Sequence, residues 1–260
     1  LEAKVGELEA TQFSTTTKLQ GDTYWTIGAN AFGGQNNNRV NGTQRNSGNW
    51  GGTTFNYDLR LNLNTSFTGK DLLYTRLRSG NYSNSAFRGK PYGLQALDRA
   101  FPGSGQVNDT FYLDRLYYRF PVGKSFTAVI GPKARNTEAL AIAPFYYGDF
   151  SGLDFFTLHG APGTYNKATG GMAAFIWKQQ VKKGKPFFAA STSYVAPSAD
   201  SSETGYTSTT SYGGVFQKNS GGSWLTQLGY QAKQWKAAFG WRYGQCGQAV
   251  NRRGTEAAVA

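Results

Sequence analysis

The chain has 260 residues, with 27 lysines and arginines against 15 aspartates and glutamates, so its net charge at pH 7 is +12. Aromatic residues make up 15% of the chain and 34 residues are glycine, a composition that favours strands and turns over a helical bundle. No segment approaches the 18 consecutive apolar residues of a membrane-spanning helix. One histidine and one cysteine cannot form a zinc or iron–sulfur site, so we expect no cofactor and no internal disulfide.

The first residues have helical periodicity. Leu1, Val5 and Leu8 are spaced as in a heptad, with charged residues between them. One heptad is too short to be a stable helix alone. The pattern indicates either the end of a longer coiled coil or a short amphipathic capping helix. We therefore divide the chain into residues 1–20, the end of a coiled-coil helix with its linker, and residues 21–260, an all-β domain.

From Asp22 onward the period becomes that of β-strands. The clearest example is residues 54–64, where apolar residues occupy the odd positions from Phe55 to Leu63 and polar residues occupy the even positions. Because alternate side chains of a strand point to opposite faces, this strand separates an apolar surface from a polar one. The pattern predicts nine strands, near residues 22–32, 54–67, 71–79, 111–121, 125–133, 171–179, 186–195, 223–231 and 235–243.

The connections between these strands alternate in length. Those near residues 68–70, 122–124 and 182–185 are short and contain lysine, whereas the others are long: 33–53, 80–110, 134–170 and 196–222. A soluble β-sandwich has mostly short loops at both ends. An outer-membrane barrel has short periplasmic turns and long external loops. The alternation therefore favours an antiparallel transmembrane β-barrel.

The charged residues indicate which face of each strand points inward. An arginine that faces lipid costs about 2–4 kcal/mol at the bilayer midplane, so the arginines of a barrel strand must face the interior. In the strand near residues 111–121, inward-facing arginines place the side chains of alternate residues outward; these are Tyr112, Leu116, Tyr118 and Phe120. Asp114 has the same outward phase, and lipid tolerates such a carboxylate only near the interface. The residues predicted to line the interior are Arg60, Arg76, Arg78, Arg115, Arg119, Asn62 and Asn64.

Aromatic residues near strand ends fit interfacial girdles, in which the rings sit at the level of the lipid headgroups. The candidates are Tyr24, Trp25, Tyr57, Phe67, Tyr118 and Phe120. The alternative is that they are ordinary core aromatics of a soluble β-protein.

Motifs for catalysis are weak. His159 is the sole imidazole and no Gly-x-Ser-x-Gly elbow occurs, which disfavours a barrel hydrolase. Asp149 and Asp154 could form a carboxylate pair for sugar hydrolysis, but a solvated or calcium-binding loop is the simpler interpretation. The arginines are spread over successive strands rather than gathered in one tract, so we expect no nucleic-acid partner and no enzyme.

Two long loops are candidates to fold inward and narrow a barrel, residues 80–110 and 134–170. We favour the first, because its charges could set a transverse field; these are Arg88, Lys90, Asp98 and Arg99, with Asp109. Residues 94–101 have helical spacing and are followed by Pro102-Gly103, which predicts a short helix there. The alternative is an external surface loop with a helical turn.

Four segments carry a shared set of motifs: residues 7–19 leading into Gly21-Asp22, and residues 57–73, 113–122 and 130–132. Together they resemble the cyanobacterial outer-membrane porins that group with the carbohydrate-selective, OprB-like porins and are often labelled iron-uptake porins. The first segment resembles the junction between coiled coil and barrel in that family. The resemblance covers most of residues 1 to 244.

The resemblance implies a porin in outer-membrane lipid that lets small ions and hydrophilic solutes diffuse passively through a water-filled barrel. It also implies a homotrimer, a periplasmic coiled coil, and an upstream module that binds peptidoglycan or the cell wall. Open porins use roughly 16–18 strands, so nine strands predict an incomplete barrel. The alternative function is a soluble extracellular β-sandwich that binds glycans through loop aromatics such as Trp50, Tyr146 and Tyr147.

Overall fold

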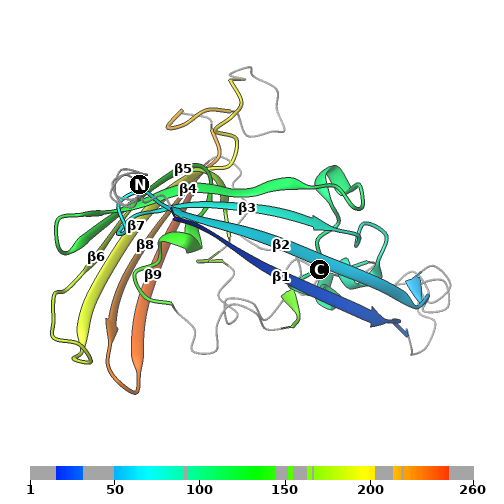
Figure 1. Cartoon of the computed structure of the whole chain (residues 1–260), viewed down its shortest axis with the longest axis horizontal. Helices are drawn as coiled ribbons and strands as arrows, with labels where there is room; N and C mark the ends of the chain where they lie inside the picture. Colours follow the sequence, from blue (N-terminus) through cyan, green and yellow to red (C-terminus); the bar gives the residue numbers. More distant parts are fainter. Residues whose placement is uncertain are drawn as a thin grey trace, which may run out of the picture.

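The computed structural model describes residues 16–31, 50–90, 93–143, 152–154, 163–165, 167–202, 213–217 and 220–245. Within these ranges the chain forms one antiparallel sheet of nine strands, in which each strand pairs with the next along the chain (Figure 1). The strands are β1 (Thr16–Gly28), β2 (Thr54–Ser66), β3 (Leu72–Gly80), β4 (Tyr112–Val122), β5 (Phe126–Arg135), β6 (Thr169–Lys178), β7 (Phe187–Ala196), β8 (Gly222–Gln231) and β9 (Lys236–Gln245). Short 3₁₀ helices are η2 (Ala86–Arg88), η3 (Gly93–Gln95), η4 (Ser104–Gln106) and η5 (Asn136–Ala139).

The nine predicted strands are confirmed, and β2 to β9 lie within two residues of the expected bounds. The prediction for β1 is wrong, because the strand begins at Thr16 rather than at residue 22 and ends at Gly28. Its length follows from β2, since the two strands pair continuously from Thr16 opposite Ser66 to Gly28 opposite Thr54. Residues 16–20, which we assigned to a linker, therefore belong to the sheet. The expected helix near the N-terminus lies outside the described residues.

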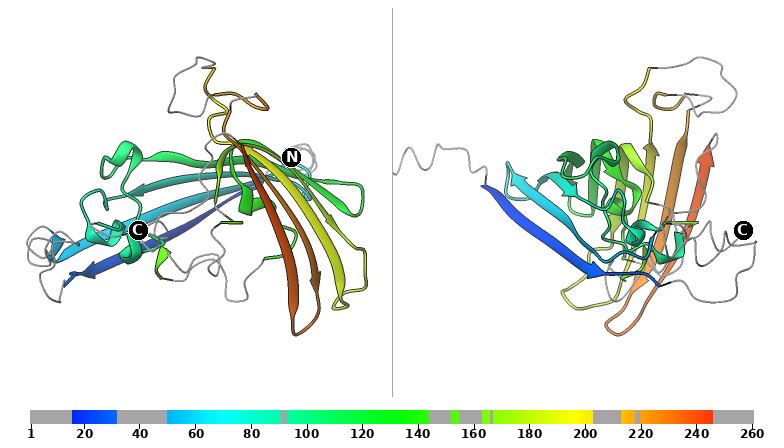
Figure 2. Two further views of the ribbon diagram at one scale, coloured as in Figure 1. Left: turned by 180° about the vertical axis from the view of Figure 1, so that it is seen from behind. Right: turned by 90° about the vertical axis from the view of Figure 1, so that its right-hand side faces the viewer.

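The sheet is strongly curved into an open trough, with β1 and β9 at its two edges (Figure 2). The 3₁₀ segments lie inside the trough, on what we call the concave face (Figure 2). In the part of the chain that the structure describes, β1 and β9 are not paired with each other, so the sheet does not close into a barrel. These strands also form no second packed sheet, so the alternative of a β-sandwich is wrong for them. No helix among the described residues is long and apolar enough to cross a membrane.

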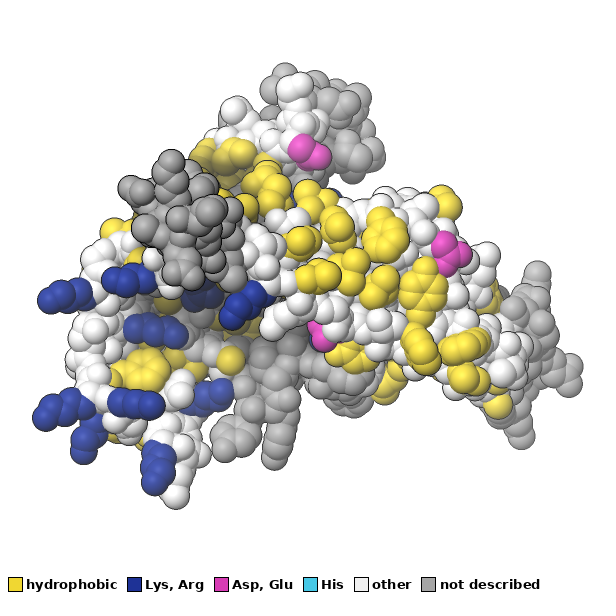
Figure 3. Space-filling model, in the orientation of Figure 1, with side chains coloured by type: hydrophobic (Ala, Val, Ile, Leu, Met, Phe, Trp, Pro, Cys, Tyr) yellow, Lys and Arg dark blue, Asp and Glu magenta, His cyan; other side chains and the backbone are white. Residues whose placement is uncertain are grey.

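The opposite, convex face is apolar and exposed. Side chains of β1 to β4 form a continuous hydrophobic patch in the space-filling view (Figure 3). Large apolar residues along the whole sheet are more than half exposed, including Trp25 at 74% and Phe239 at 68%. A contiguous apolar surface of this kind requires an apolar partner such as lipid or another protein.

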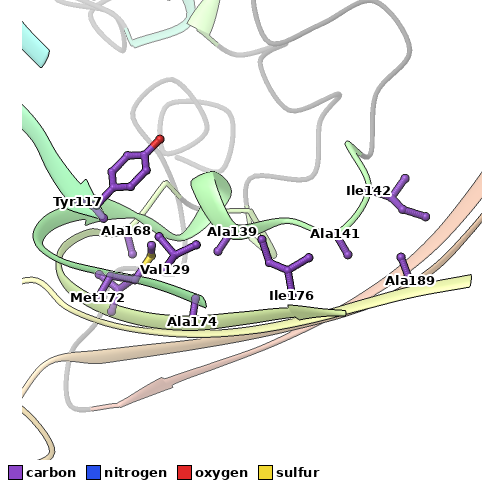
Figure 4. Close-up of a cluster of buried hydrophobic side chains, with 12 residues drawn as sticks. Tyr117, Val129, Ala139, Ala141, Ile142, Ala168, Met172, Ala174, Ile176 and Ala189 are labelled. Atoms are coloured by element: carbon purple, nitrogen blue, oxygen red, sulfur yellow. The ribbon is translucent and has the colours of Figure 1, made fainter. Parts of the chain in front are cut away.

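The concave face of β4 to β7 is covered by the segment that follows β5. Ala139, Ala141 and Ile142 of this segment pack on Val129 and Ile176 of the sheet, and all of these residues are buried (Figure 4). The cluster fixes the course of the loop after β5 across the inside of the trough.

Candidate functional site

The polar side chains of β2, β3 and β4 share the concave face. Burial along β2 alternates, with Asn56, Asp58, Arg60 and Asn62 buried between partly exposed apolar residues. The strand register then places Arg60 opposite Arg78, Asn62 opposite Arg76, and Arg76 opposite Arg115. The four arginines therefore stand side by side on one wall of the trough. Such a row of like charges is stable only if acidic groups or water compensate it.

Asp58 supplies the first compensation. Its carboxylate is fully buried and accepts a hydrogen bond from Arg78 Nε at 2.9 Å. A second nitrogen of Arg78 contacts the other carboxylate oxygen, and Arg60 Nε lies 3.4 Å from Oδ1. One carboxylate thus pairs two arginines of neighbouring strands. Removing it would leave both guanidinium groups buried without this partner, which costs several kcal/mol in buried pairs.

Asp114 supplies the second carboxylate that compensates the arginines. The outward phase predicted for this residue is wrong. Arg76 pairs with Arg115 but Leu77 pairs with Leu113, so Asp114 is the extra residue of a β-bulge. The bulge changes the alternation, and Asp114 points to the concave face, where its Oδ1 lies 3.1 Å from Arg115 and its Oδ2 lies 3.6 Å from Arg76.

Tyr112, which we expected on the outer face, follows the same bulge inward. Its hydroxyl donates to Asp114 and its ring stacks on Phe101 at 5.0 Å between centroids. Tyr24, expected in an outer girdle, also lies inside, because Arg99 sits 4.9 Å above its ring. Leu116, Tyr118 and Phe120 keep the outward phase, and the rings of the last two stack at 5.2 Å.

The predicted lining residues differ in how far they reach solvent. Arg115 is only 1% exposed and is held between Asp114 and Glu138, whose Oε1 lies 3.4 Å from its Nε. Arg115 is therefore shielded from open water, contrary to the prediction that it lines the interior of a barrel. Asn62 is also buried, and its Oδ1 accepts from Tyr74 at 2.8 Å and from Arg76 Nε at 2.7 Å.

Asn64 and Arg119 lie nearer the ends of their strands and are partly exposed. The Asn64 amide donates to Gln20 at 3.0 Å. Arg119 pairs in register with Leu72.

The described parts of both long loops that we considered fold onto the concave face, and they contact each other. Leu97 and Leu153 form an antiparallel β-bridge, supported by hydrogen bonds from Asp98 N to Gly152 O at 2.9 Å and from Asp154 N to Ala96 O at 2.7 Å. A buried ion pair joins the same loops, with Lys167 Nζ 3.1 Å from Asp98 Oδ1. The two candidates are therefore parts of one assembly.

The helix predicted for residues 94–101 is wrong. The chain makes only the 3₁₀ turn η3 and then extends into the bridge at Leu97. Pairing with a segment distant in sequence outweighs the local helical spacing. Phe101 lies against the arginine wall, with the guanidinium of Arg78 4.6 Å from the centroid of its ring.

Gln227 of β8 anchors the loop after β5 on the far wall. This fully buried side chain accepts from Ile142 N and donates to Ile142 O, both at 3.0 Å, and also donates to the Tyr165 hydroxyl at 3.1 Å. Ser191 of β7 accepts from Ala141 N at 3.1 Å. The loop is thus tied to β7 and β8 by buried polar side chains.

Two neighbouring hollows lie between these loops and the arginine wall. The larger encloses about 460 Å³ and the smaller about 240 Å³, and Arg60 and Arg135 line both. The basic side chains that line them are Arg60, Arg76, Arg78, Arg88, Arg99, Arg135 and Lys167, and the acidic ones are Asp22, Asp98, Glu138 and Asp154. The hollows are thus strongly polar, with seven basic side chains against four acidic ones.

Lys90 is not among these lining residues. Its ammonium donates to Ser83 O at 2.8 Å and lies 5.2 Å from the ring of Trp50. Of the remaining sequence candidates, Asp154 is buried against Ala96, whereas Asp149, His159, Tyr146 and Tyr147 lie outside the described residues. Within the described ranges no three His, Cys, Asp or Glu side chains gather as a metal site requires.

Comparison with known protein families decides the classification. A family model described as "Carbohydrate-selective porin, OprB family" matches residues 1–256. This chain belongs to the OprB family. The uncharacterized protein sll0772 of Synechocystis sp. is 30% identical over 245 residues, which are 89% of this chain and 37% of that protein. The uncharacterized protein alr4550 of Nostoc sp. is 35% identical over 157 residues, 57% of this chain and 24% of that protein.

This OprB-family chain therefore spans well under half the length of the two curated cyanobacterial relatives. No solved structure matches it significantly.

Several important residues of this OprB-family chain were not identified from the sequence. Asp58 already had the inward phase of its strand, so alternation could have indicated it. Arg135 lies just beyond the predicted end of its strand, and Glu138 and Lys167 reach the site through the long-range folding of the loop between β5 and β6, for which the sequence carries no local signal. Gln227 lies in the predicted strand β8, but its partner Ile142 is 85 positions away in the sequence.

The short β2–β3 turn is built around Asp71. Its Oδ1 accepts from Thr68 N and Thr68 Oγ1, both at 2.7 Å, and its Oδ2 accepts from the Tyr118 hydroxyl at 2.6 Å. Desolvation alone would raise the pKa of this carboxyl, but the hydrogen bonds from Tyr118, Thr68 and Ser66 outweigh it and hold the pKa well below its usual range. The ionised carboxylate therefore stabilises the turn.

Proposed function

We propose that this chain forms part of an outer-membrane β-barrel porin through which small hydrophilic solutes and ions diffuse passively. The observation that carries the proposal is the contrast between the two faces of one sheet. The convex face exposes large apolar side chains, while the concave face gathers arginines, aspartates and asparagines around polar hollows. A membrane barrel has this arrangement, with lipid outside and water inside. We propose that further strands of the full-length protein close the sheet, because an open edge is not viable in lipid.

The dimensions of β2 match a bilayer. Exposed aromatic rings mark both ends of its outward side, Phe55 at one end and Phe67 at the other. They are twelve residues apart, which is about 40 Å along a strand at roughly 3.3 Å per residue. At a typical tilt of about 40° this corresponds to roughly 30 Å along the membrane normal, close to the hydrocarbon thickness. Trp25, 6.3 Å from Phe55, continues the first girdle on the neighbouring strand.

We propose that the two inward loops form the constriction of the pore. Arg88, Asp98 and Arg99 of the first loop and Lys167 of the second surround the hollows beside the arginine wall. The excess of basic groups favours anions through Coulomb attraction in a confined space. The buried ion pairs hold the loops in place, while the partly exposed arginines meet the solute.

The resemblance and the family support further proposals about assembly. We propose a homotrimer, with the short turns and the N-terminal region on the periplasmic side, next to an upstream module that binds the cell wall. The alternation of short turns and long loops supports this orientation. In intact cells, protease should cut within residues 36–39 but not at Lys182-Lys183, and the reverse pattern would contradict it.

Liposome swelling tests the proposed function. Vesicles that contain the purified full-length protein should swell in isotonic solutions of small sugars, at rates that fall as the sugar becomes larger. Vesicles with the heat-denatured protein are the control. Equal, slow swelling in both preparations, with the native protein shown to be inserted, would refute passive diffusion.

A further inference from the structure

The short turns form a strongly basic end of the sheet. Six lysines of the turns after β2, β4, β6 and β8 are exposed: Lys70, Lys124, Lys182, Lys183, Lys185 and Lys233. In the described residues none of them forms an ion pair with an acidic side chain. Asp71 is the only acidic residue of these turns, and its carboxylate is occupied by hydrogen bonds within its own turn. Figure 3 shows the lysines and arginines gathered at this end, at the lower left of the view.

An apolar groove lies on the sheet directly beside two of these turns. It encloses about 550 Å³ across β6 to β9. Its walls are the aromatic rings of Trp177, Phe188 and Phe239, and small residues such as Ala190 and Ala237 leave its floor open. Phe188 and Phe239 are 56% and 68% exposed, so no described part of the chain covers them.

The groove and the lysines are adjacent. Phe188 pairs with Tyr230 at the end of the outward-facing groove. The next pair along the strands, Phe187 with Gln231, lines a second hollow of about 370 Å³ at the rim of the sheet, and Phe187 itself points to the concave side, where it packs on the buried cluster. This hollow lies between the two turns and is lined by Lys182, Lys183, Lys185 and Lys233. A molecule that lies in the groove and reaches the lysines of this rim must therefore carry an apolar chain next to an anionic group.

We propose that the groove and the basic turns bind an anionic lipid of the periplasmic leaflet, with an acyl chain between the aromatic walls and the headgroup on the lysines. The groove lies toward the same, short-turn end of the strands as the aromatic ring of Phe67, which is the depth at which an acyl chain meets its headgroup. Lysines near a membrane surface select anionic over zwitterionic headgroups. A free anion would use the lysines but not the groove, and a neutral lipid would use the groove but not the lysines.

The test compares retained lipids in the full-length protein. The protein is reconstituted in nanodiscs of equal parts phosphatidylglycerol and phosphatidylcholine, then washed in detergent, and the bound lipids are counted by native mass spectrometry. The native protein should retain phosphatidylglycerol preferentially. The triple variant Lys182→Ser/Lys183→Ser/Lys185→Ser should retain at least about fivefold less of it, the order expected for the loss of even one lysine contact, while the triple Lys→Arg variant should retain the native amount.

The groove is tested separately with Ala190→Phe, which fills its floor. This variant should retain less of both lipids, whereas the matched control Ala173→Phe, on the outward side of β6 but outside the groove, should not. Equal retention of the two lipids by the native protein would overturn the proposal. So would unchanged retention in the triple serine variant, or displacement of the lipid by soluble glycerol phosphate.

This inference rests on the proposed insertion in a membrane, and flotation distinguishes the two failures. Protein that does not float with liposomes contradicts the proposed function. Protein that floats but shows no preference for phosphatidylglycerol contradicts only the lipid site.

Discussion

Replacement of Leu61 by arginine tests which face of β2 meets lipid. Leu61 lies six residues from both Phe55 and Phe67, so it occupies the middle of the outward apolar band. Its neighbours across the sheet are Gly21 and Leu77, neither of which offers a charge or a hydrogen-bonding side chain to a guanidinium. At roughly 15 Å from either girdle, the arginine should be unable to bring its charge into water.

The expected loss is about 2–4 kcal/mol of folding free energy, the cost of arginine at the midplane of a barrel. This lowers the folding equilibrium constant by about 30-fold to several hundred-fold. The same side chain at Asn64 is the matched control, because Asn64 faces the concave side and its amide makes only a partly exposed hydrogen bond to Gln20. Asn62 is a less suitable control, since Arg76 and Tyr74 both donate to its carbonyl oxygen.

Folding of the full-length protein into lipid vesicles, titrated with urea, measures the difference. The folded form is followed by its shifted mobility on unheated gels. Leu61→Arg should be strongly destabilised, Asn64→Arg should change the folding free energy by less than about 1 kcal/mol, as is usual for exposed sites, and Leu61→Ile should resemble the native protein. Equal tolerance of arginine at both positions would refute the assignment of the faces.

Three further predictions concern the loops and the turn. Charge reversal at Arg88 and Arg99 together should shift the reversal potential in a salt gradient toward cations, because both line the hollows; an unchanged potential with normal insertion would remove them from the pore. Lys167→Met removes one of two basic partners of the buried Asp98 carboxylate and leaves Arg99, whose Nε lies 3.5 Å from Oδ2, so the loss should be smaller than the about 3–5 kcal/mol of a fully unpaired buried charge. Amide exchange at the bridge between the loops should rise, and unchanged exchange would show that this ion pair does not hold the loops together. Asp71→Asn should destabilise the protein at neutral pH. The pKa of Asp71 is lowered in the folded protein, so the carboxylate contributes its stabilisation above the unfolded pKa of about 3.9 and loses it as the pH falls from there toward the folded pKa. The thermal unfolding temperatures of the variant and the native protein should therefore converge in acid. A difference between them that does not depend on pH would contradict this.

The faces of the strands were predictable wherever the alternation is unbroken. In β2 the sequence separates Leu59, Leu61 and Leu63 from Arg60 and Asn62, and burial in the structure follows the same alternation. The reason is physical: a period of two residues leaves each side chain only two orientations, and the charged ones cannot share the apolar side.

The bulge at Asp114 could not be predicted from β4 alone. A bulge is a property of two paired strands, and it became visible only when Arg76 and Leu77 of β3 were aligned with β4. The same limit explains β1, where Thr16 to Gln20 carry little apolar character. These residues pair with the end of β2, and the Thr17 and Thr65 hydroxyls are 2.8 Å apart. Pairing with β2, and not the local strand preference of residues 16–20, therefore determines where β1 begins.

The interior assembly was predictable only in part. The charges of Arg88, Asp98 and Arg99 indicated a functional loop, but its ion pair to Lys167 joins residues 69 positions apart. Loop closure over such a distance is set by packing against the whole trough, including the hydrogen bonds of Gln227 to the other loop. No local pattern encodes these contacts.

Single-channel recording of the purified full-length protein in a planar lipid bilayer tests the central claim most directly. The account predicts discrete conductance steps that are ohmic at low voltage and grow with salt concentration, as expected for a water-filled pore. It also predicts a modest preference for anions, in keeping with the excess of basic side chains around the hollows. Protein that inserts into the bilayer but gives no such steps would contradict the claim that the concave face lines a pore.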